Sequence, residues 1–141
     1  MITDADIILE ARSWVGTPWK HGVARKGWGT DCGQFLIEMF KTFGWVRPDF
    51  KVMPYNVDYS LHNTKSLMRE ELERLGAQEL ADKADVQVGD VLLFLNGKCE
   101  AHTGLFIGGG NFVHAHVRDG VTISPLRQYA GVHLSTWRVR R

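Results

Sequence analysis

The sequence predicts an α+β domain in which N-terminal helices pack on an antiparallel β-sheet. Apolar residues recur with helical spacing over the first half of the chain, whereas short apolar runs separated by glycine-containing turns follow from about residue 86. A chain of 141 residues can bury a full core, so we expect one domain over 1–141. A net charge of +1 gives no indication of nucleic-acid binding.

The first helix is expected over residues 4–15. Thr3 and Asp6 have the spacing of a helix-capping pair, and Gly16-Thr17-Pro18 ends the pattern. The glycine-rich, basic segment 16–31 then reads as a loop that leads into a second helix.

The second helix has the clearest pattern in the chain. Asp31 is a suitable N-cap, and Gly44 is a suitable C-terminal stop. Residues 45–62 have no clear period and read as a loop, and a third helix is expected from about Thr64 to Leu75. The helical repeat after Asp31 comprises Cys32, Phe35, Leu36, Met39, Phe40 and Phe43.

Strands are predicted in the last third of the chain. Asn96-Gly97 is a strong turn signal after the first of them, and Asp119-Gly120 marks another turn. The expected strands are 91–95, 102–107, 111–117, 120–124 and one near 132–139.

The N-terminal sequence has no signal-peptide pattern, because Met1–Asp6 has neither the basic start nor the apolar run of a signal peptide. No apolar stretch approaches membrane-spanning length, so no membrane partner is expected. We therefore expect synthesis in the cytoplasm without a leader. Two cysteines, Cys32 and Cys99, do not make a disulfide scaffold, and Cys99, in a charged turn, is expected to be an exposed free thiol.

Three residues have the types and positions required for thiol catalysis. Cys32 begins a helix, whose N-terminus favours the thiolate, and His102 begins a strand. His114 follows on the next strand, where cross-strand neighbours share a face. These residues can act as nucleophile, base and orienting group, with amides of the first helical turn holding an oxyanion. His116 shares a strand face with His114 and is the alternative orienting residue.

Other readings of the same residues stay open. A single cysteine on a helix is more often part of the core, and a strand histidine is usually structural. A zinc site from Cys32, His102 and His114 is conceivable, but the spacing matches no recognised zinc pattern, so neither metal nor cofactor is expected. The remaining histidines, His21, His62, His116 and His133, are interpreted as surface or groove residues.

Five blocks of sequence, in the same order and spread over nearly the whole chain, resemble the NlpC/P60 family of papain-like cell-wall peptidases. Asp31-Cys32-Gly33-Gln34-Phe35 is similar to the family's Asp-Cys-Ser-Gly-Phe, and the segment 102–108 to His-Val-Gly-Ile-Tyr-Ile-Gly. Phe112-Val113-His114-Ala115 resembles Phe-Ile-His-Ala. Gly89–Phe94 resembles the family's Gly-Asp-Leu-Val-Phe-Phe strand, which precedes the catalytic histidine. Gly16-Thr17-Pro18-Trp19 resembles the family's Gly-Thr-Pro-Tyr.

The resemblance implies a papain-like fold and a cysteine endopeptidase that cuts peptidoglycan stem peptides at the γ-D-glutamyl–diamino acid bond. It implies that Cys32, His102 and His114 are catalytic and that Asp31, Trp19 and Gly33 contact the stem peptide. The chain departs from the family pattern at Gly33-Gln34 and Trp19.

Residues 45–75 look like the insert of phage-tail and gene-transfer-agent members. The expected setting is therefore a phage or prophage tail that acts at the bacterial cell wall, with tail proteins as partners. Two rival functions remain: a catalytically silent tail-assembly protein, and an amidase or acyltransferase on another amide.

Overall fold

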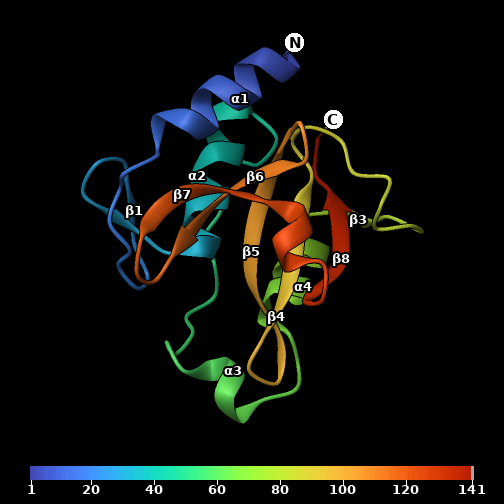
Figure 1. Ribbon diagram of the computed structural model, residues 1–141. Coiled ribbons are helices and arrows are strands. Elements are labelled where there is room, and N and C mark those ends of the chain that lie inside the picture. Colours follow the sequence, from blue (N-terminus) through green and yellow to red (C-terminus); the bar gives the residue numbers. More distant parts are fainter. Residues whose placement is uncertain (141) are drawn as a thin grey trace.

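The computed structural model describes residues 1–140 and confirms the α+β fold (Figure 1). The helices are α1 (Asp4–Ser13), α2 (Cys32–Phe43), the short α3 (Tyr59–His62) and α4 (Leu67–Arg74). The strands are β1 (Ala24–Arg25), β2 (Gly29–Thr30), β3 (Gln78–Glu79), β4 (Val91–Asn96), β5 (Cys99–Gly108), β6 (Asn111–His116), β7 (Gly120–Pro125) and β8 (His133–Arg138), with a 3₁₀ turn, η1 (Leu126–Tyr129), before β8.

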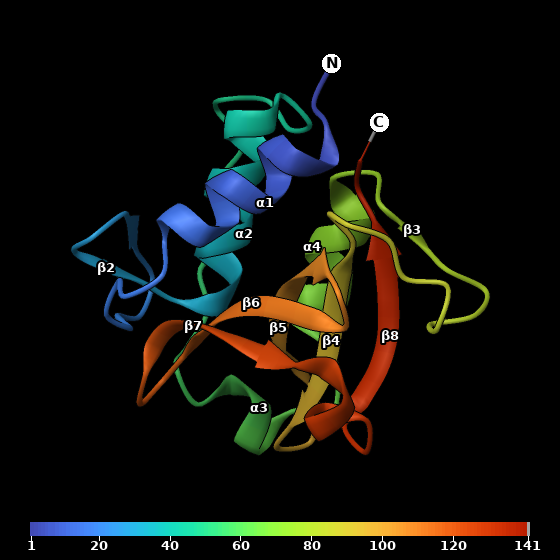
Figure 2. The same ribbon diagram turned by 45° about the horizontal axis from the view of Figure 1, so that its top comes forward.

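The strands β3 to β8 form one antiparallel sheet in the order β3-β8-β4-β5-β6-β7, and β1 pairs with β2 in a separate hairpin. In the register of the sheet, Leu105 of β5 lies opposite Val113 of β6, and His114 lies opposite Thr122 of β7. Helices α1, α2 and α4 all contact β5 (Figures 1 and 2). Strand β5 is therefore the element around which the rest of the molecule is arranged.

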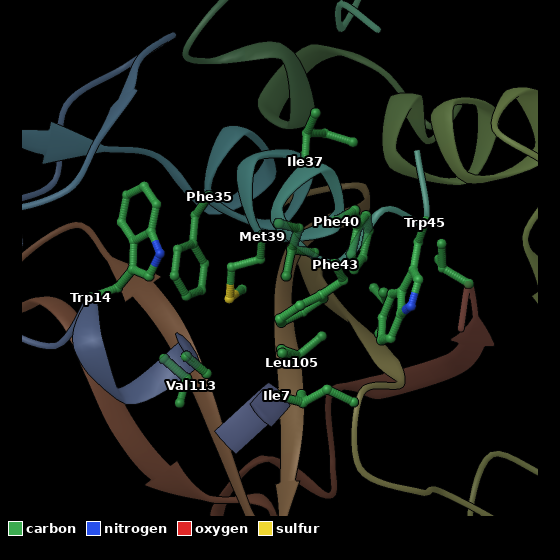
Figure 3. Packing of buried hydrophobic residues seen from close by; sticks show 14 of the residues in the cluster. Ile7, Trp14, Phe35, Ile37, Met39, Phe40, Phe43, Trp45, Leu105 and Val113 are labelled. Carbon is green, nitrogen blue, oxygen red and sulfur yellow. The ribbon is translucent and has the colours of Figure 1, made fainter. Parts of the chain in front are cut away.

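The main core lies between α1, α2 and the sheet (Figure 3). Phe35 and Met39 of α2 are fully buried against Leu105 and Val113 of the central strands, and Ile7 of α1 closes this layer. Because side chains alternate along a strand, the opposite face of the sheet carries a second apolar cluster. That cluster consists of Leu92, Phe94, Phe106 and Phe112.

Local signals in the sequence explain where the helices begin and end. Thr3 and Asp6 form the expected capping box at α1, and the Asp31 carboxylate accepts a hydrogen bond from Gln34 N at the start of α2. Gly44 ends α2 in the left-handed conformation, with φ of 74°, which glycine adopts without a steric penalty. These caps fix the N-terminus of α2, where Cys32 lies.

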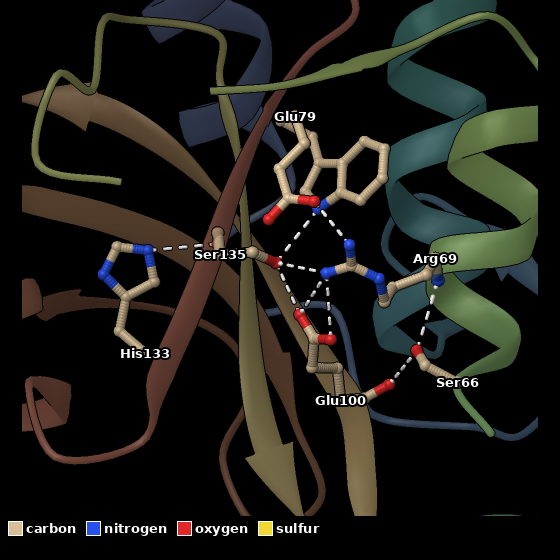
Figure 4. A network of polar contacts seen from close by, with 7 residues as sticks. Ser66, Arg69, Glu79, Glu100, His133 and Ser135 are labelled. Atoms are coloured by element: carbon tan, nitrogen blue, oxygen red, sulfur yellow. Dashed lines mark hydrogen bonds and ion pairs between the residues drawn. The ribbon is translucent and has the colours of Figure 1, made fainter. Parts of the chain in front are cut away.

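A polar network joins α4 to the sheet (Figure 4). The Arg69 guanidinium pairs with Glu79 and, at 3.1 Å, with Glu100 of β5. Glu100 also accepts a hydrogen bond from Ser135 Oγ at 2.5 Å, and its carbonyl accepts one from Ser66 Oγ at 2.6 Å. The network therefore anchors β5 two residues before His102.

Several expectations need correction. The first helix ends at Ser13, and the third begins at Leu67 because Ser66 caps it. The loops expected over 16–31 and 45–62 contain the β1–β2 hairpin and α3. Strand β5 begins at Cys99, three residues earlier than predicted, since it pairs with β4 as far as Asn96.

Two polar residues are buried where the sequence suggested exposure. Cys99 is only 5% exposed, because pairing with Asn96 places it inside the sheet rather than in the turn. His133, 6% exposed, is buried because its Nε2 bonds Thr136 Oγ1 at 2.9 Å and it packs against Phe94. Within residues 1–140, none of the helices has the length and hydropathy needed to cross a bilayer.

Candidate active site

Cys32 is the first residue of α2, and its thiol lies against the backbone of β5. Cys32 Sγ donates a weak hydrogen bond to the Ala101 carbonyl, with a separation of 3.8 Å. The Thr103 N–H also faces the sulfur, where it favours the thiolate. The thiol is thus placed beside the two peptide groups that flank His102.

His102 and His114 form a hydrogen-bonded pair across β5 and β6. His102 Nε2 lies 2.7 Å from His114 Nδ1, and His114 Nε2 lies 2.8 Å from Ser124 Oγ of β7. The His114 side chain is completely buried and stacks against Phe112 at a ring distance of 4.5 Å. The second ring nitrogen of His102, Nδ1, makes no hydrogen bond within residues 1–140, so it is the atom that remains for proton transfer.

The structure brings His114, rather than His116, to His102. The His116 ring instead lies 3.6 Å from the Asp119 carboxylate, and its Nδ1 accepts a hydrogen bond from Arg118 N. In the part of the chain that is described, no three His, Cys, Asp or Glu side chains are grouped so that they could hold a metal ion.

The thiol is not the pre-formed thiolate that a helix N-terminus alone would favour. Burial and the neighbouring Asp31 carboxylate raise the pKa of Cys32 to about 12. The N–H groups of Thr103, Cys32 and Gly33 act in the opposite direction but are outweighed. The expectation of a lowered pKa is therefore wrong, because it considered the helix terminus without the desolvation around it.

Both histidines of the pair are neutral at neutral pH. Burial lowers the pKa of His102 to about 3 and that of His114 to about 4, and neighbouring imidazoles add to both effects. The Cys32 thiol and both imidazoles are therefore neutral. Proton transfer in such a site accompanies the attack on the substrate instead of preceding it.

Asp31 is buried and its carboxylate is fully engaged. Oδ1 accepts from Gln34 N at 2.8 Å, while Oδ2 accepts from Gly22 N at 2.8 Å and from the Tyr55 hydroxyl. The His21 ring lies 4.0 Å from the same oxygen. Asp31 therefore ties the N-terminus of α2 to the loops on both sides of it.

Trp19, Asp31, Cys32, Gly33 and His102 all line one groove of about 320 Å³, whereas His114 lies behind His102. The groove continues over apolar side chains of α4 and of the segment before α3. The absence of a side chain at Gly33 matters here, since a Cβ at this position would lie 3.3 Å from Met68 Cε. The apolar wall of the groove includes Val52, Met53, Val57, Leu67, Met68 and Leu72.

His21, interpreted from the sequence as a surface or groove residue, lines the groove. Sequence reasoning missed two other residues that the structure places at the site, Tyr55 and Ser124. Tyr55 lies in a segment without periodicity, and nothing local indicated its contact with Asp31, 24 residues away. Ser124 is different, because its place on the strand next to His114 follows from the hairpin pattern, and the turn at Asp119-Gly120 could have located it.

Comparison with known proteins agrees with the fold. The NlpC/P60 family model matches residues 16–141. The murein DD-endopeptidase MepS/murein LD-carboxypeptidase of Escherichia coli is 27% identical over 123 residues, which is 86% of this chain and 54% of that protein. A probable endopeptidase of Haemophilus influenzae is 27% identical over 135 residues, which is 94% of this chain and 70% of the length of that protein. This chain thus spans about half the length of the Escherichia coli relative.

Solved structures show the same fold at low identity. The NlpC/p60 domain of the peptidoglycan hydrolase SagA superposes with a TM-score of 0.67 at 18% identity, over 97% of this chain and 99% of that domain. The peptidoglycan hydrolase RipB of Mycobacterium tuberculosis superposes with a TM-score of 0.62 at 22% identity, over 98% of this chain and 65% of that chain. With the family model covering residues 16–141, the chain belongs to the NlpC/P60 family.

Proposed function

We propose that the protein is a cysteine peptidase that hydrolyses the peptide part of peptidoglycan. The observation that carries the proposal is the docking of the Cys32 thiol on β5 beside His102, whose ring is in turn bonded to His114. The names of the Escherichia coli and SagA relatives support a peptidoglycan substrate.

In the first step, Cys32 Sγ attacks the carbonyl carbon of the scissile amide while its proton passes to His102 Nδ1. The tetrahedral oxyanion is stabilised by N–H groups of the first turn of α2, where the Cys32 and Gly33 amides have no carbonyl partner within the helix. When the intermediate collapses, the C–N bond breaks, and the leaving amine takes the proton from His102. A thioester on Cys32 remains.

In the second step, water attacks the thioester and gives one proton to His102 Nδ1. The C–S bond breaks, the product leaves as a carboxylic acid, and the proton returns from His102 to the thiolate. His114 keeps its hydrogen bond to His102 Nε2 through both steps, so it orients the base without exchanging protons with the substrate.

The favoured bond is the amide between γ-linked D-glutamate and the diamino acid of a stem peptide. Asp31 and Trp19, which line the groove beside Cys32, are proposed to position the stem, with the Asp31 carboxylate facing its free amine. A second candidate is a D,D cross-link, which the name of the Escherichia coli relative favours. The products of the two reactions differ in mass.

We also propose a phage or prophage tail as the setting, with action at the bacterial cell wall. The support is the resemblance of residues 45–75, which contain α3 and α4, to the insert of tail-associated members. Mass spectrometry of purified particles from the source organism would detect the chain as a virion component. Its absence from particles that contain the other tail proteins would refute this setting.

Incubation with purified sacculi, followed by mass analysis of released fragments, tests the function. We expect a dipeptide ending in γ-D-glutamate and a fragment with a new amine on the diamino acid. Cys32→Ala should release nothing, while the matched control Cys99→Ala, at the second thiol of the chain, should retain hydrolysis.

Two outcomes would refute the proposal. Release of the intact stem peptide from the sugar would identify an amidase. No product from any sacculus, together with an unreactive Cys32 toward iodoacetamide, would favour a structural role in tail assembly.

A further inference from the structure

Ser124 is the last member of the hydrogen-bonded series that begins at the base. Its Oγ lies 2.8 Å from His114 Nε2, and His114 Nδ1 lies 2.7 Å from His102 Nε2. We propose that Ser124 is a positioning residue that accepts a hydrogen bond from His114 Nε2 and thereby stabilises the tautomer in which His102 can act as base. This inference rests on the proposed thiol mechanism.

The direction of each hydrogen bond follows from the chemistry required at His102. Its Nδ1 must be unprotonated to accept the proton of Cys32, so the neutral ring carries its proton on Nε2 and donates it to His114 Nδ1. His114 Nδ1 is then an acceptor, which places the only proton of the His114 ring on Nε2. That N–H requires an acceptor, and Ser124 Oγ is in place to be one.

The reverse arrangement would inactivate the site. If His114 carried its proton on Nδ1, it would donate to His102 Nε2, and the His102 proton would lie on Nδ1, the atom that has to receive the proton of Cys32. The Ser124 hydroxyl can serve either arrangement, but a side chain without a hydroxyl at this position leaves the buried Nε2–H of His114 in the active arrangement without an acceptor. The same logic explains why a wrong histidine tautomer is so damaging in serine proteases.

The fold holds Ser124 and His114 in place for this contact. The two residues lie on neighbouring strands and on the same face, since Ser124 pairs with Phe112 and His114 with Thr122. The His114 ring packs between Phe112 and Tyr129, with ring distances of 4.5 and 5.5 Å, so it cannot turn toward other partners. Within residues 1–140, its two nitrogens have only His102 and Ser124 as hydrogen-bond partners.

The test compares substitutions that differ in the hydroxyl but not in shape. Ser124→Thr keeps an acceptor, whereas Ser124→Val has the same branching without one. Thr122→Val is the matched control, because it removes a hydroxyl from the same strand that makes no side-chain hydrogen bond in the described chain. We expect kcat to fall about three- to tenfold in Ser124→Val, with KM within twofold, and to stay near wild type in the other two.

Nitrogen-15 NMR of the histidine rings measures the tautomers directly, and these would not change if Ser124 contributed only to packing. In the wild type and in Ser124→Thr, both His102 and His114 should carry their proton on Nε2. In Ser124→Val, the Nδ1–H form of both rings should rise. This measurement needs no substrate, so it separates failure of the inference from failure of the proposed peptidase activity.

Two results would overturn the inference. One is a His114 ring protonated on Nδ1 in the wild type, which would make Ser124 the donor. The other is equal kcat for Ser124→Thr and Ser124→Val, with tautomers unchanged in both. If Ser124→Val does not fold, the wild-type tautomers and the Ser124→Thr rate still decide the question.

Discussion

The Tyr55 hydroxyl donates a hydrogen bond to the Asp31 carboxylate, one residue before the nucleophile. The Tyr55 carbonyl lies 3.2 Å from His21 Nε2, and the two rings meet edge to face at 5.0 Å. The segment between α2 and α3 is thereby held across the groove. The carboxylate proposed to bind the amine of the substrate is occupied in this arrangement, so Tyr55 and the substrate compete for the same oxygen.

Tyr55→Phe should therefore make the groove more accessible. Loss of this hydrogen bond leaves Gly22 N as the remaining donor to Asp31 Oδ2 and loosens the segment. We expect alkylation of Cys32 by iodoacetamide to accelerate about threefold or more. Tyr59→Phe is the matched control, since its hydroxyl has no hydrogen-bond partner within residues 1–140. An unchanged alkylation rate in Tyr55→Phe would show that the contact does not restrict access.

His102 and His114 should differ sharply in their response to substitution. His102→Ala removes the base, a loss of about 10²–10⁴ in kcat. His114→Asn keeps a polar group toward His102 Nε2 and should retain measurable activity, with His114→Ala below it. Steady-state kinetics of the three variants provide the test. Full activity of His114→Ala together with loss of activity in His116→Ala would instead assign the orienting role to His116.

Stability should fall on acidification because of the buried histidines. The pKa values of His102, His114 and His133 are all lowered by burial. Below about pH 6.5 the unfolded chain binds protons at these residues while the folded protein does not, so the free energy of unfolding decreases toward pH 4. Urea unfolding at pH 7, 5.5 and 4.5 measures this slope.

The matched variant for this experiment is His114→Gln, which removes one of the three titrating groups. Its stability should decline less steeply with falling pH than that of the wild type. An identical slope would mean that His114 takes up its proton equally in both states.

The network around Glu100, whose side chain is 12% exposed, should contribute measurably to stability. Glu100→Gln leaves Arg69 without one of its two partners and weakens the acceptor for Ser135, so we expect a loss of about 1–3 kcal/mol in the free energy of unfolding. Glu70→Gln, which breaks an exposed pair with Lys65, is the control and should change it by less than about 0.5 kcal/mol. Chemical denaturation compares the two, and equal losses would contradict the buried role of Glu100.

Periodicity and caps were sufficient to predict α2 to the residue and the order of the main strands. Asp31 and Gly44 are local signals for the ends of α2. The glycine turn between β5 and β6 likewise indicates that the two strands pair antiparallel. Short elements such as β1, β2 and α3 have too few residues to show a period. Their positions depend on contacts with distant parts of the chain.

The candidate site divides in the same way. The placement of Cys32 and His102 followed from motifs, and the pairing of His114 with His102 followed from strand geometry. The high pKa of Cys32 did not, because desolvation depends on which segments cover the thiol. The contact of Tyr55 with Asp31 likewise joins two segments whose approach only the tertiary fold determines.

The nucleophile and the base reach the site on opposite sides of one packed interface. Cys32 moves with α2, whereas His102, His114 and Ser124 belong to a single sheet, and Phe35, Met39, Leu105 and Val113 fill the space between them (Figure 3). We expect a slight loosening of this layer to move the sulfur relative to the imidazole before the histidine pair or any helix is lost. Catalytic activity is consequently more sensitive than helix content to a loss of native packing in this protein. On heating, activity should be lost at a lower temperature than helix content.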